Sequence, residues 1–134
     1  LPHRIVHVLV FDSKGRMAIQ LRSWKKSFCP NHWSTTVGGH VQKGETYEEA
    51  ALREFEEELG RKPEIELISK FWYEAGGLKK SITTFKTVYE DGFNVNPEEV
   101  QKVEYLTLEK IYKMIESGEK FHPELLFLLD RLKH

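Results

Sequence analysis

A glycine-rich loop followed by an acidic helix constrains the fold of this chain more than any other feature. Thr46 followed three residues later by Glu49 is a capping-box pattern, so a helix is expected to begin there. Gly60 supplies the stop, and the predicted helix spans residues 47–59. The loop that enters this helix reads Gly38-Gly39-His40-Val41-Gln42-Lys43-Gly44-Glu45.

Three carboxylates of the predicted helix share one face. Glu54, Glu57 and Glu58 stand at positions i, i+3 and i+4. Like charges at these spacings repel one another, and acids in a last turn oppose the helix dipole. Convergent carboxylates form a hard oxygen ligand set that suits Mg²⁺ or Mn²⁺. The pattern indicates a metal site, although a Glu-rich helix taken alone is also consistent with an ordinary solvated acidic face.

The complete spacing of this stretch resembles the signature box of the Nudix hydrolases, at about residues 39–61. All the fixed residues of that box are present, and a chance match is on the order of 10⁻⁷ per starting position. Two slots that usually hold hydrophobic residues differ, because Phe55 is aromatic and Arg61 is charged. The spacing reads Gly39-x5-Glu45-x7-Arg53-Glu54-Phe55-x-Glu57-Glu58-x-Gly60.

The Nudix resemblance implies a metal-binding set. Glu57 and Glu58 would coordinate the metal, and Glu54 would ligate it or position it. The backbone carbonyl of Gly38 would add a further oxygen, which a residue without Cβ leaves accessible.

The resemblance also implies supporting and catalytic roles. Arg53 would orient the carboxylates through bidentate pairing, and Glu45 would brace the loop. The base that activates water differs among Nudix enzymes, so it would be either a box glutamate such as Glu54 or a loop glutamate. In this chain the loop candidates are Glu99 and its neighbour Glu98, and a solvated loop acid is the alternative for either.

A narrower resemblance points to type I isopentenyl-diphosphate isomerases and the uncharacterised hydrolases similar to them. In that branch, residues at the positions of Arg22 and Lys26 contact the diphosphate, and those at His3 and His40 help to hold a metal. A solvated basic loop is the alternative for the first pair. The isomerase needs a Cys where this chain has Gly38, which favours hydrolysis. The resemblance is carried by His3-Arg4, Gln20-x-Arg22-Ser23, Lys26, Pro30 and Gly39-His40.

These residues suit attack by water on a pyrophosphate link, which needs a cation, a positioned base and basic side chains for the outer phosphate. We therefore expect a metal-dependent hydrolase that cleaves a nucleoside diphosphate linked to another moiety, or a related organic pyrophosphate. The alternatives are an isopentenyl-diphosphate isomerase-like enzyme and a Nudix module that binds without catalysis. The expected catalytic residues are Arg53, Glu54, Glu57 and Glu99.

Composition limits the setting and the partners. A chain of 134 residues with 40% hydrophobic content can bury one core, so residues 1–134 are expected to form a single domain. The formal net charge of -1 gives no electrostatic case for a nucleic-acid or membrane partner. A single cysteine, Cys29, and the absence of a signal-like or membrane-spanning run fit a reducing cytoplasmic setting. The start at Leu1 suggests that a native N-terminal segment precedes it. The sequence does not decide whether the chain forms a homodimer.

The order of predicted elements gives an α+β fold with a mixed sheet and helices on both faces. The Nudix resemblance implies the same α/β/α sandwich. Residues 4–11 and 16–21 should form a hairpin, and a last helix should run from Pro123 to about Lys133. The remaining predicted strands are residues 33–40, 64–73, 81–89 and 103–106, and the remaining helix is residues 108–116, capped by Thr107.

Overall fold

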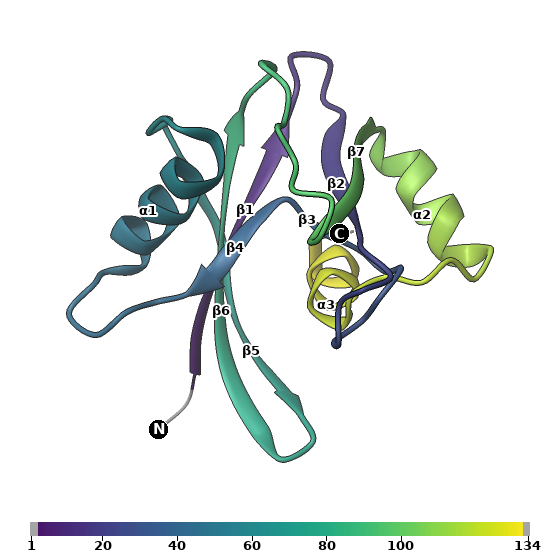
Figure 1. Ribbon diagram of the computed structural model, residues 1–134. Helices are drawn as coiled ribbons and strands as arrows, with labels where there is room; N and C mark the ends of the chain where they lie inside the picture. The colour runs from purple at the N-terminus through teal and green to yellow at the C-terminus, as the bar shows by residue number, and fades with distance from the viewer. Residues whose placement is uncertain (1–2, 133–134) are drawn as a thin grey trace. The chain divides into compact units, whose positions relative to one another are not determined.

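The structure, a computed structural model, describes residues 3–132 and all of their side chains except that of residue 75. The described residues fall into two compact units (Figure 1). The first unit comprises residues up to Val10 together with Val37–Tyr89, and the second comprises Phe11–Thr36 together with the residues from Glu90 onward. A single domain over residues 1–134 stays a prediction, and the units are described one at a time.

The first unit is built on a sheet whose central strand is β1 (His3–Phe11). Strand β4 (Val37–His40) runs antiparallel to β1, in a register that pairs Ile5 with His40. Strand β6 (Leu78–Val88) is the other neighbour of β1 in this unit, and β5 (Glu66–Ala75) pairs antiparallel with β6 and ends the sheet. The sequence prediction placed the ends of the β5 and β6 strands one to three residues away from these bounds.

Helix α1 (Tyr47–Leu59) has the predicted bounds, because both of its ends are fixed by local chemistry. The Thr46 hydroxyl accepts from the Glu49 amide at 3.1 Å, and the Glu49 carboxylate accepts from the Thr46 amide at 2.8 Å. Gly60 ends the helix with a φ of 76°, a left-handed conformation that glycine adopts without strain. The helix buries Ala50, Ala51 and Phe55, so its opposite face lies at the surface.

The second unit has β2 (Met17–Arg22) at its centre. Strands β3 (Trp33–Thr35) and β7 (Val100–Leu106) both run antiparallel to β2. Phe11, the last residue of β1, belongs to this unit and pairs with Met17. Helices α2 (Leu108–Glu116) and α3 (Pro123–Leu132) complete the unit, and each buries an apolar stripe. Their positions follow the predicted caps, with the Thr107 hydroxyl accepting from the Lys110 amide at 3.1 Å.

Three predicted boundaries differ from the structure or lie outside it. The strand predicted at residues 33–40 is two strands separated at Thr36, because β3 pairs with β2 whereas β4 pairs with β1. Strand β7 begins at Val100 rather than at residue 103, since Arg22 pairs with Val100 across a bulge. The predicted helix end at Lys133 lies outside the described residues. Within the described range no helix is long and apolar enough to span a membrane.

Candidate active site on the loop and helix of the first unit

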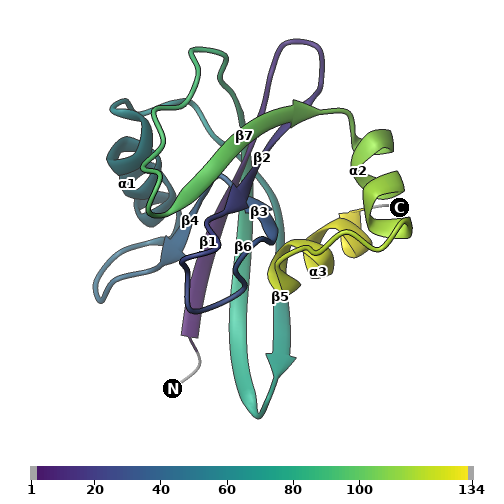
Figure 2. The same cartoon turned by 45° about the vertical axis from the view of Figure 1, so that its right-hand side comes forward.

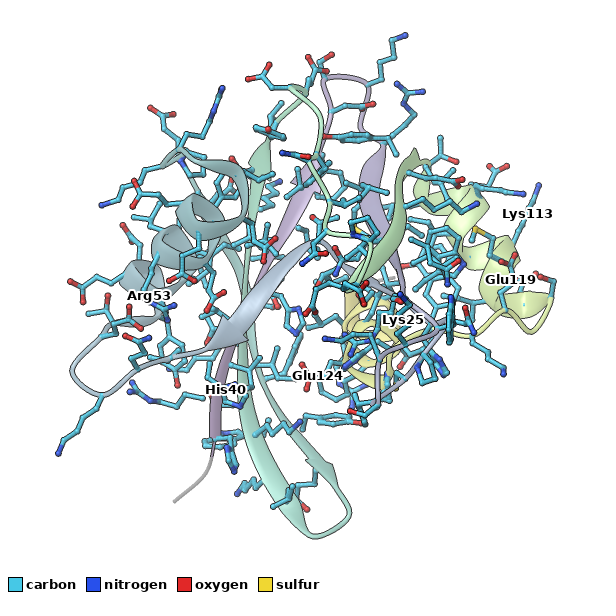
Figure 3. The ribbon with its side chains drawn as sticks, viewed as in Figure 1. Lys25, His40, Arg53, Lys113, Glu119 and Glu124 are labelled. Carbon is cyan, nitrogen blue, oxygen red and sulfur yellow. The ribbon has the colours of Figure 1, made fainter. Side chains whose placement is uncertain are left out.

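Arg53 of α1 connects the helix to the glycine-rich loop. Its guanidinium donates from Nε to Glu45 Oε2 at 2.6 Å and from Nη2 to Glu45 Oε1 at 3.0 Å, which is a bidentate pair. The same Nη2 donates to the backbone carbonyl of His40 at 3.0 Å. Figure 3 labels Arg53 on the helix and His40 at the end of β4. The bidentate pairing predicted for Arg53 is therefore present, but its partner is the loop residue Glu45.

The loop is held from a second side by Arg4, a residue of β1 to which the sequence prediction gave no role. Arg4 donates to the backbone carbonyls of Gln42 at 3.3 Å and Glu45 at 3.4 Å. The Glu45 carboxylate also accepts from the Gln42 amide at 2.8 Å. Hydrogen bonds from Arg53 and from this amide lower the pKa of Glu45 to about 2. The ionised Glu45 carboxylate thus links the loop to Arg53, in agreement with its predicted bracing role.

Glu54 lies where the helix meets the loop. Its side chain is 16% exposed and accepts from Arg53 Nη1 at 2.9 Å. Burial raises the pKa of this carboxyl, against the opposing effect of the neighbouring guanidinium. A Cβ built on Gly39 would lie 2.6 Å from Glu54 Cδ and 2.9 Å from Oε2. Position 39 must therefore be glycine for the carboxylate to keep this place, a reason that the sequence pattern alone does not reveal.

Glu57 lies one turn further along α1 and is more open to solvent. Its side chain is 58% exposed, and one oxygen lies 3.4 Å from Arg53 Nη1. Among residues 3–132, no three His, Cys, Asp or Glu side chains are arranged as metal ligands. Arg53 instead supplies positive charge to Glu54 and Glu57. The ligand set of Gly38, Glu54, Glu57 and Glu58 stays a prediction.

The donor chemistry of this face fits a hard divalent cation. Glu54, Glu57 and Glu58 stand at positions i, i+3 and i+4 of a single helix, and carboxylate and carbonyl oxygens are what Mg²⁺ and Mn²⁺ prefer. The orienting group is also present, because Arg53 fixes the Glu54 carboxylate from one side and the Gly39 backbone confines it from the other.

Gly38 lies directly opposite His7 in the β4–β1 pairing. A Cβ at this position would lie 3.1 Å from His7 Nδ1 and 3.1 Å from the Val6 carbonyl oxygen. These separations are tighter than ordinary van der Waals contact, so even a small side chain would need a shift of its neighbours. The cysteine that the isomerase resemblance would require here would need His7 or the Val6 carbonyl to shift by a few tenths of an ångström.

His40 and His3 lie together, as the second resemblance implied. Their ring centroids are 5.8 Å apart in an edge-on arrangement, and both residues are exposed. Only the backbone carbonyl of His40 enters the hydrogen bonds of Arg53. A role for either imidazole in binding metal or substrate stays a prediction.

The two departures from the signature box have a common explanation in Tyr89. The fully buried Phe55 ring meets the Tyr89 ring edge-on, with centroids 5.6 Å apart. The Arg61 guanidinium lies 5.5 Å from the same ring. An aromatic residue on the helix and a cation after it therefore both pack against one side chain near the end of the unit.

In the second unit, the predicted phosphate-contacting and loop-base residues form ion pairs with one another. Lys26 Nζ lies 2.5 Å from Glu99 Oε2, and Lys25 Nζ lies 3.1 Å from Glu98 Oε1. The hydrogen bond from Lys26 lowers the pKa of Glu99. The sequence did not indicate that candidates from two distant segments would neutralise each other's charge.

Arg22 supports the loop that follows β2. Its Nε and Nη2 both donate to the Phe28 carbonyl, at 3.1 and 2.9 Å, and Nε also lies 3.2 Å from the Cys29 carbonyl. Burial raises the pKa of the Cys29 thiol, as expected for an unreactive cysteine. Trp33 is buried, whereas Trp24 is exposed.

Comparison with known proteins places this site in a family. The NUDIX domain model matches residues 1–129. An uncharacterised Nudix hydrolase of Listeria innocua is 38% identical over 120 residues, which are 87% of this chain and 70% of the relative. An isopentenyl-diphosphate isomerase of Serratia proteamaculans is 36% identical, over 56% of this chain and 42% of that enzyme.

The fold agrees with the same family. A crystal structure from Deinococcus radiodurans matches with a TM-score of 0.85 and 31% identity, over 98% of this chain and 83% of the other. This likeness confirms the predicted α+β fold with a mixed sheet. Nudix hydrolases generally need divalent metal ions and act on small molecules. The chain belongs to the NUDIX family and is a hydrolase of phosphorus-containing anhydrides.

Proposed function

We propose that this enzyme uses Mg²⁺ or Mn²⁺ to cleave the pyrophosphate link of a nucleoside diphosphate joined to another moiety, or of a related organic pyrophosphate. The observation that carries the proposal is the environment of Glu54. This carboxylate is largely buried, confined by the Gly39 backbone and hydrogen-bonded to Arg53. A carboxyl with a raised pKa and a fixed orientation is suited to accept a proton from water.

The metal would be held by Glu57, Glu58 and Glu54 together with the Gly38 carbonyl. When bound, it would neutralise charge on the phosphate oxygens and lower the pKa of bound water. Arg53 acts as a positioning residue, since it touches two of the carboxylates and the loop without being a ligand itself. Removal of such a supporting residue typically costs 10- to 100-fold in metal affinity or activity.

The narrower resemblance implies that Arg22 and Lys26 contact the substrate diphosphate, and we assign His40 of the adjoining loop to the same substrate-binding group. The ion pair with Glu99 implies that Lys26 would exchange one anionic partner for another on binding a phosphate. The pKa of Glu99 is lowered, which makes it a weaker base than Glu54. We therefore assign the base to Glu54 and a pairing role to Glu99.

The isomerase is the second candidate, and the Serratia relative favours it. The site of this chain argues against it, because Gly38 stands where the isomerase needs a cysteine, and no thiol is therefore available at this position. A binding module without catalysis is the third candidate. It gives no reason to keep repelling carboxylates on one helix face. A reducing cytoplasmic location, consistent with the single Cys29, is part of the proposal.

A substrate panel tests the reaction. Nucleoside diphosphates linked to sugars, nucleosides or other groups would be incubated with Mg²⁺ or Mn²⁺, and nucleotide or phosphate release would be measured. Hydrolysis of at least one class is expected, with no isomer formed from isopentenyl diphosphate. Isomer formation would establish the second candidate instead, and tight binding without turnover would establish the third.

A thermal-shift measurement tests the metal separately from the substrate. Mg²⁺ or Mn²⁺ should raise the melting temperature, because a ligand that binds only the folded state stabilises it by mass action. The Glu57→Gln/Glu58→Gln double variant should lose this shift. Glu48→Gln/Glu49→Gln, on the first turn of the same helix, is the matched control and should keep it. An equal shift in both variants would place the metal elsewhere.

A further inference from the structure

We infer that the free edge of β5 is a self-association surface, at which two copies of this chain pair antiparallel with Trp72 facing Trp72 of the second copy. This inference concerns assembly and does not depend on the proposed reaction. The sequence left open whether the chain forms a homodimer, and the β5 edge is where we place its interface.

The edge itself is the first observation. β5 is a ten-residue strand that pairs with β6 and with no other strand in the described part of the chain. Figure 2 shows β5 on the outer side of the β5–β6 hairpin. An outer strand of this length presents a row of backbone donors and acceptors that can pair with another strand.

The turn determines which backbone groups face outward. Gly76 and Gly77 have φ values of 57° and 79°, so the hairpin closes with a two-residue turn that has positive φ at both positions. In such a hairpin the flanking residues exchange backbone hydrogen bonds, and the pattern then alternates along the strand. Residues 71 and 73 therefore bond to β6, whereas Lys70, Trp72 and Glu74 direct their N–H and C=O groups outward.

The same three residues have exposed side chains on one face of the strand. Trp72 is 56% exposed, and Lys70 and Glu74 are exposed on either side of it. Apolar exposure is concentrated on this hairpin, which carries four of the eight exposed large hydrophobic residues found in the described chain. These four are Leu67, Trp72, Leu78 and Val88. By the β5–β6 register, Leu67 shares the face of Trp72, whereas Leu78 and Val88 lie on the opposite face. The apolar surface beside the open edge is therefore that of Trp72 and Leu67, and such exposure is typical of an interaction site.

Charge selects a second copy of the chain and fixes the register. With Trp72 opposite itself, Lys70 of each copy lies directly opposite Glu74 of the other, and residues with outward-facing backbone groups meet one another. A shift of the centre to Lys70 or to Glu74 brings identical charges face to face. A centre at residue 71 or 73 leaves both of these charges without an opposite charge across the pair. Only the pairing centred on Trp72 places Lys70 and Glu74 opposite each other.

Cation–π contacts within one copy already restrict the side chains of Lys70 and Trp72, which would contact the second copy. Lys70 Nζ lies 4.5 Å from the centroid of the Tyr47 ring, and Lys79 Nζ lies 4.8 Å from that of Trp72. Side chains held in this way lose less freedom when a partner arrives. A lysine on an edge strand commonly discourages pairing, but in this register each lysine meets a carboxylate. The edge therefore favours one partner and one alignment.

Sedimentation velocity over a range of protein concentrations tests the inference, with circular dichroism to confirm folding. The wild-type chain should dimerise reversibly. Lys70→Glu and Glu74→Lys should each raise the dimer dissociation constant roughly tenfold or more, because each change creates two like-charge contacts by symmetry. The double variant Lys70→Glu/Glu74→Lys should restore dimerisation. Lys86→Glu, an exposed change on β6, is the matched control and should leave the constant unchanged.

Tryptophan substitutions give an independent readout. Trp72→Ala should weaken the dimer, whereas Trp24→Ala, at a somewhat more exposed tryptophan in the second unit, should not. A chain that stays monomeric at all concentrations would overturn the inference. A dimer that is insensitive to both charge reversals would also overturn it, since the contact would then lie elsewhere. Either result would leave the hydrolase assignment intact, because hydrolysis is measured separately.

Discussion

Charged side chains hold a loop in each of the two units, but they do so in different ways. In the first unit, Arg53 and Glu45 are only 22% and 17% exposed, and the guanidinium forms a fork that also reaches backbone and a second carboxylate. In the second unit, Lys26 and Glu99 are 29% and 56% exposed and meet through a single contact. Lys25 and Glu98 are more exposed still.

The Arg53–Glu45 pair therefore has a fixed geometry, whereas the Lys26–Glu99 pair can change partners. Planar bidentate pairing defines orientation as well as attraction, whereas a lone ammonium can rotate and change partners at little cost. Exposed ion pairs contribute about 0–1 kcal/mol to stability, so they can be replaced by a substrate phosphate. The first unit therefore fixes the orientation of its carboxylates, whereas the lysine–glutamate pairs of the second unit can separate at little cost in stability.

The largest expected effect tests which unit supplies the base. Glu54→Gln should lower turnover by a factor of roughly 10² or more, since it removes a positioned carboxylate. Glu99→Gln is the matched change in the second unit and should retain near-normal turnover. Steady-state kinetics on the best substrate of the panel measures both. If Glu99→Gln showed the larger loss, the base would belong to the loop.

The next largest loss of activity is expected when the Arg53 guanidinium is removed. Arg53→Ala should reduce activity about 10- to 100-fold, because three carboxylates lose a common partner. Arg53→Lys keeps the charge but cannot form the bidentate pair, so most of the loss should remain. Lys26→Arg in the second unit should be tolerated. Full activity in Arg53→Lys would show that charge alone is sufficient and that geometry is not required.

Acid should weaken the first unit through Glu45. Its pKa of about 2 in the folded state lies below the ordinary value of about 4.3 in an unfolded chain. The contribution of this carboxylate is fully present above about pH 5 and is lost as the pH falls toward 2. Glu45→Gln should therefore flatten the fall in unfolding free energy over that window, as measured by urea denaturation. Glu56→Gln, an exposed change on the same helix, should leave the slope unchanged.

The smallest effect is expected from the exposed pairs. Lys25→Ala and Lys26→Ala should each change the unfolding free energy by less than about 1 kcal/mol. Lys26→Ala should nevertheless raise KM more than it lowers kcat if Lys26 contacts phosphate, and Lys25→Ala should do neither. A large loss of stability in either variant would contradict the view that these pairs are exchangeable.

The sequence by itself determined the elements whose ends are fixed by near neighbours. Helix α1 has the predicted bounds because Thr46, Glu49 and Gly60 satisfy its terminal backbone groups within a few residues. Helix α2 agrees for the same reason, with Thr107 at its start. The spacing of the box also predicted the family, and the match of the NUDIX domain model to residues 1–129 confirms it.

Tertiary structure alone decided which partners these residues take. The division of residues 33–40 at Thr36 follows from pairing with two different strands, which no local pattern encodes. Glu45, rather than one of the predicted metal ligands, forms the bidentate pair with Arg53. The Glu54 carboxylate, fifteen residues after Gly39, occupies the space that a Cβ at position 39 would fill. Such contacts depend on how distant segments meet, and a sequence fixes them only through the folded chain.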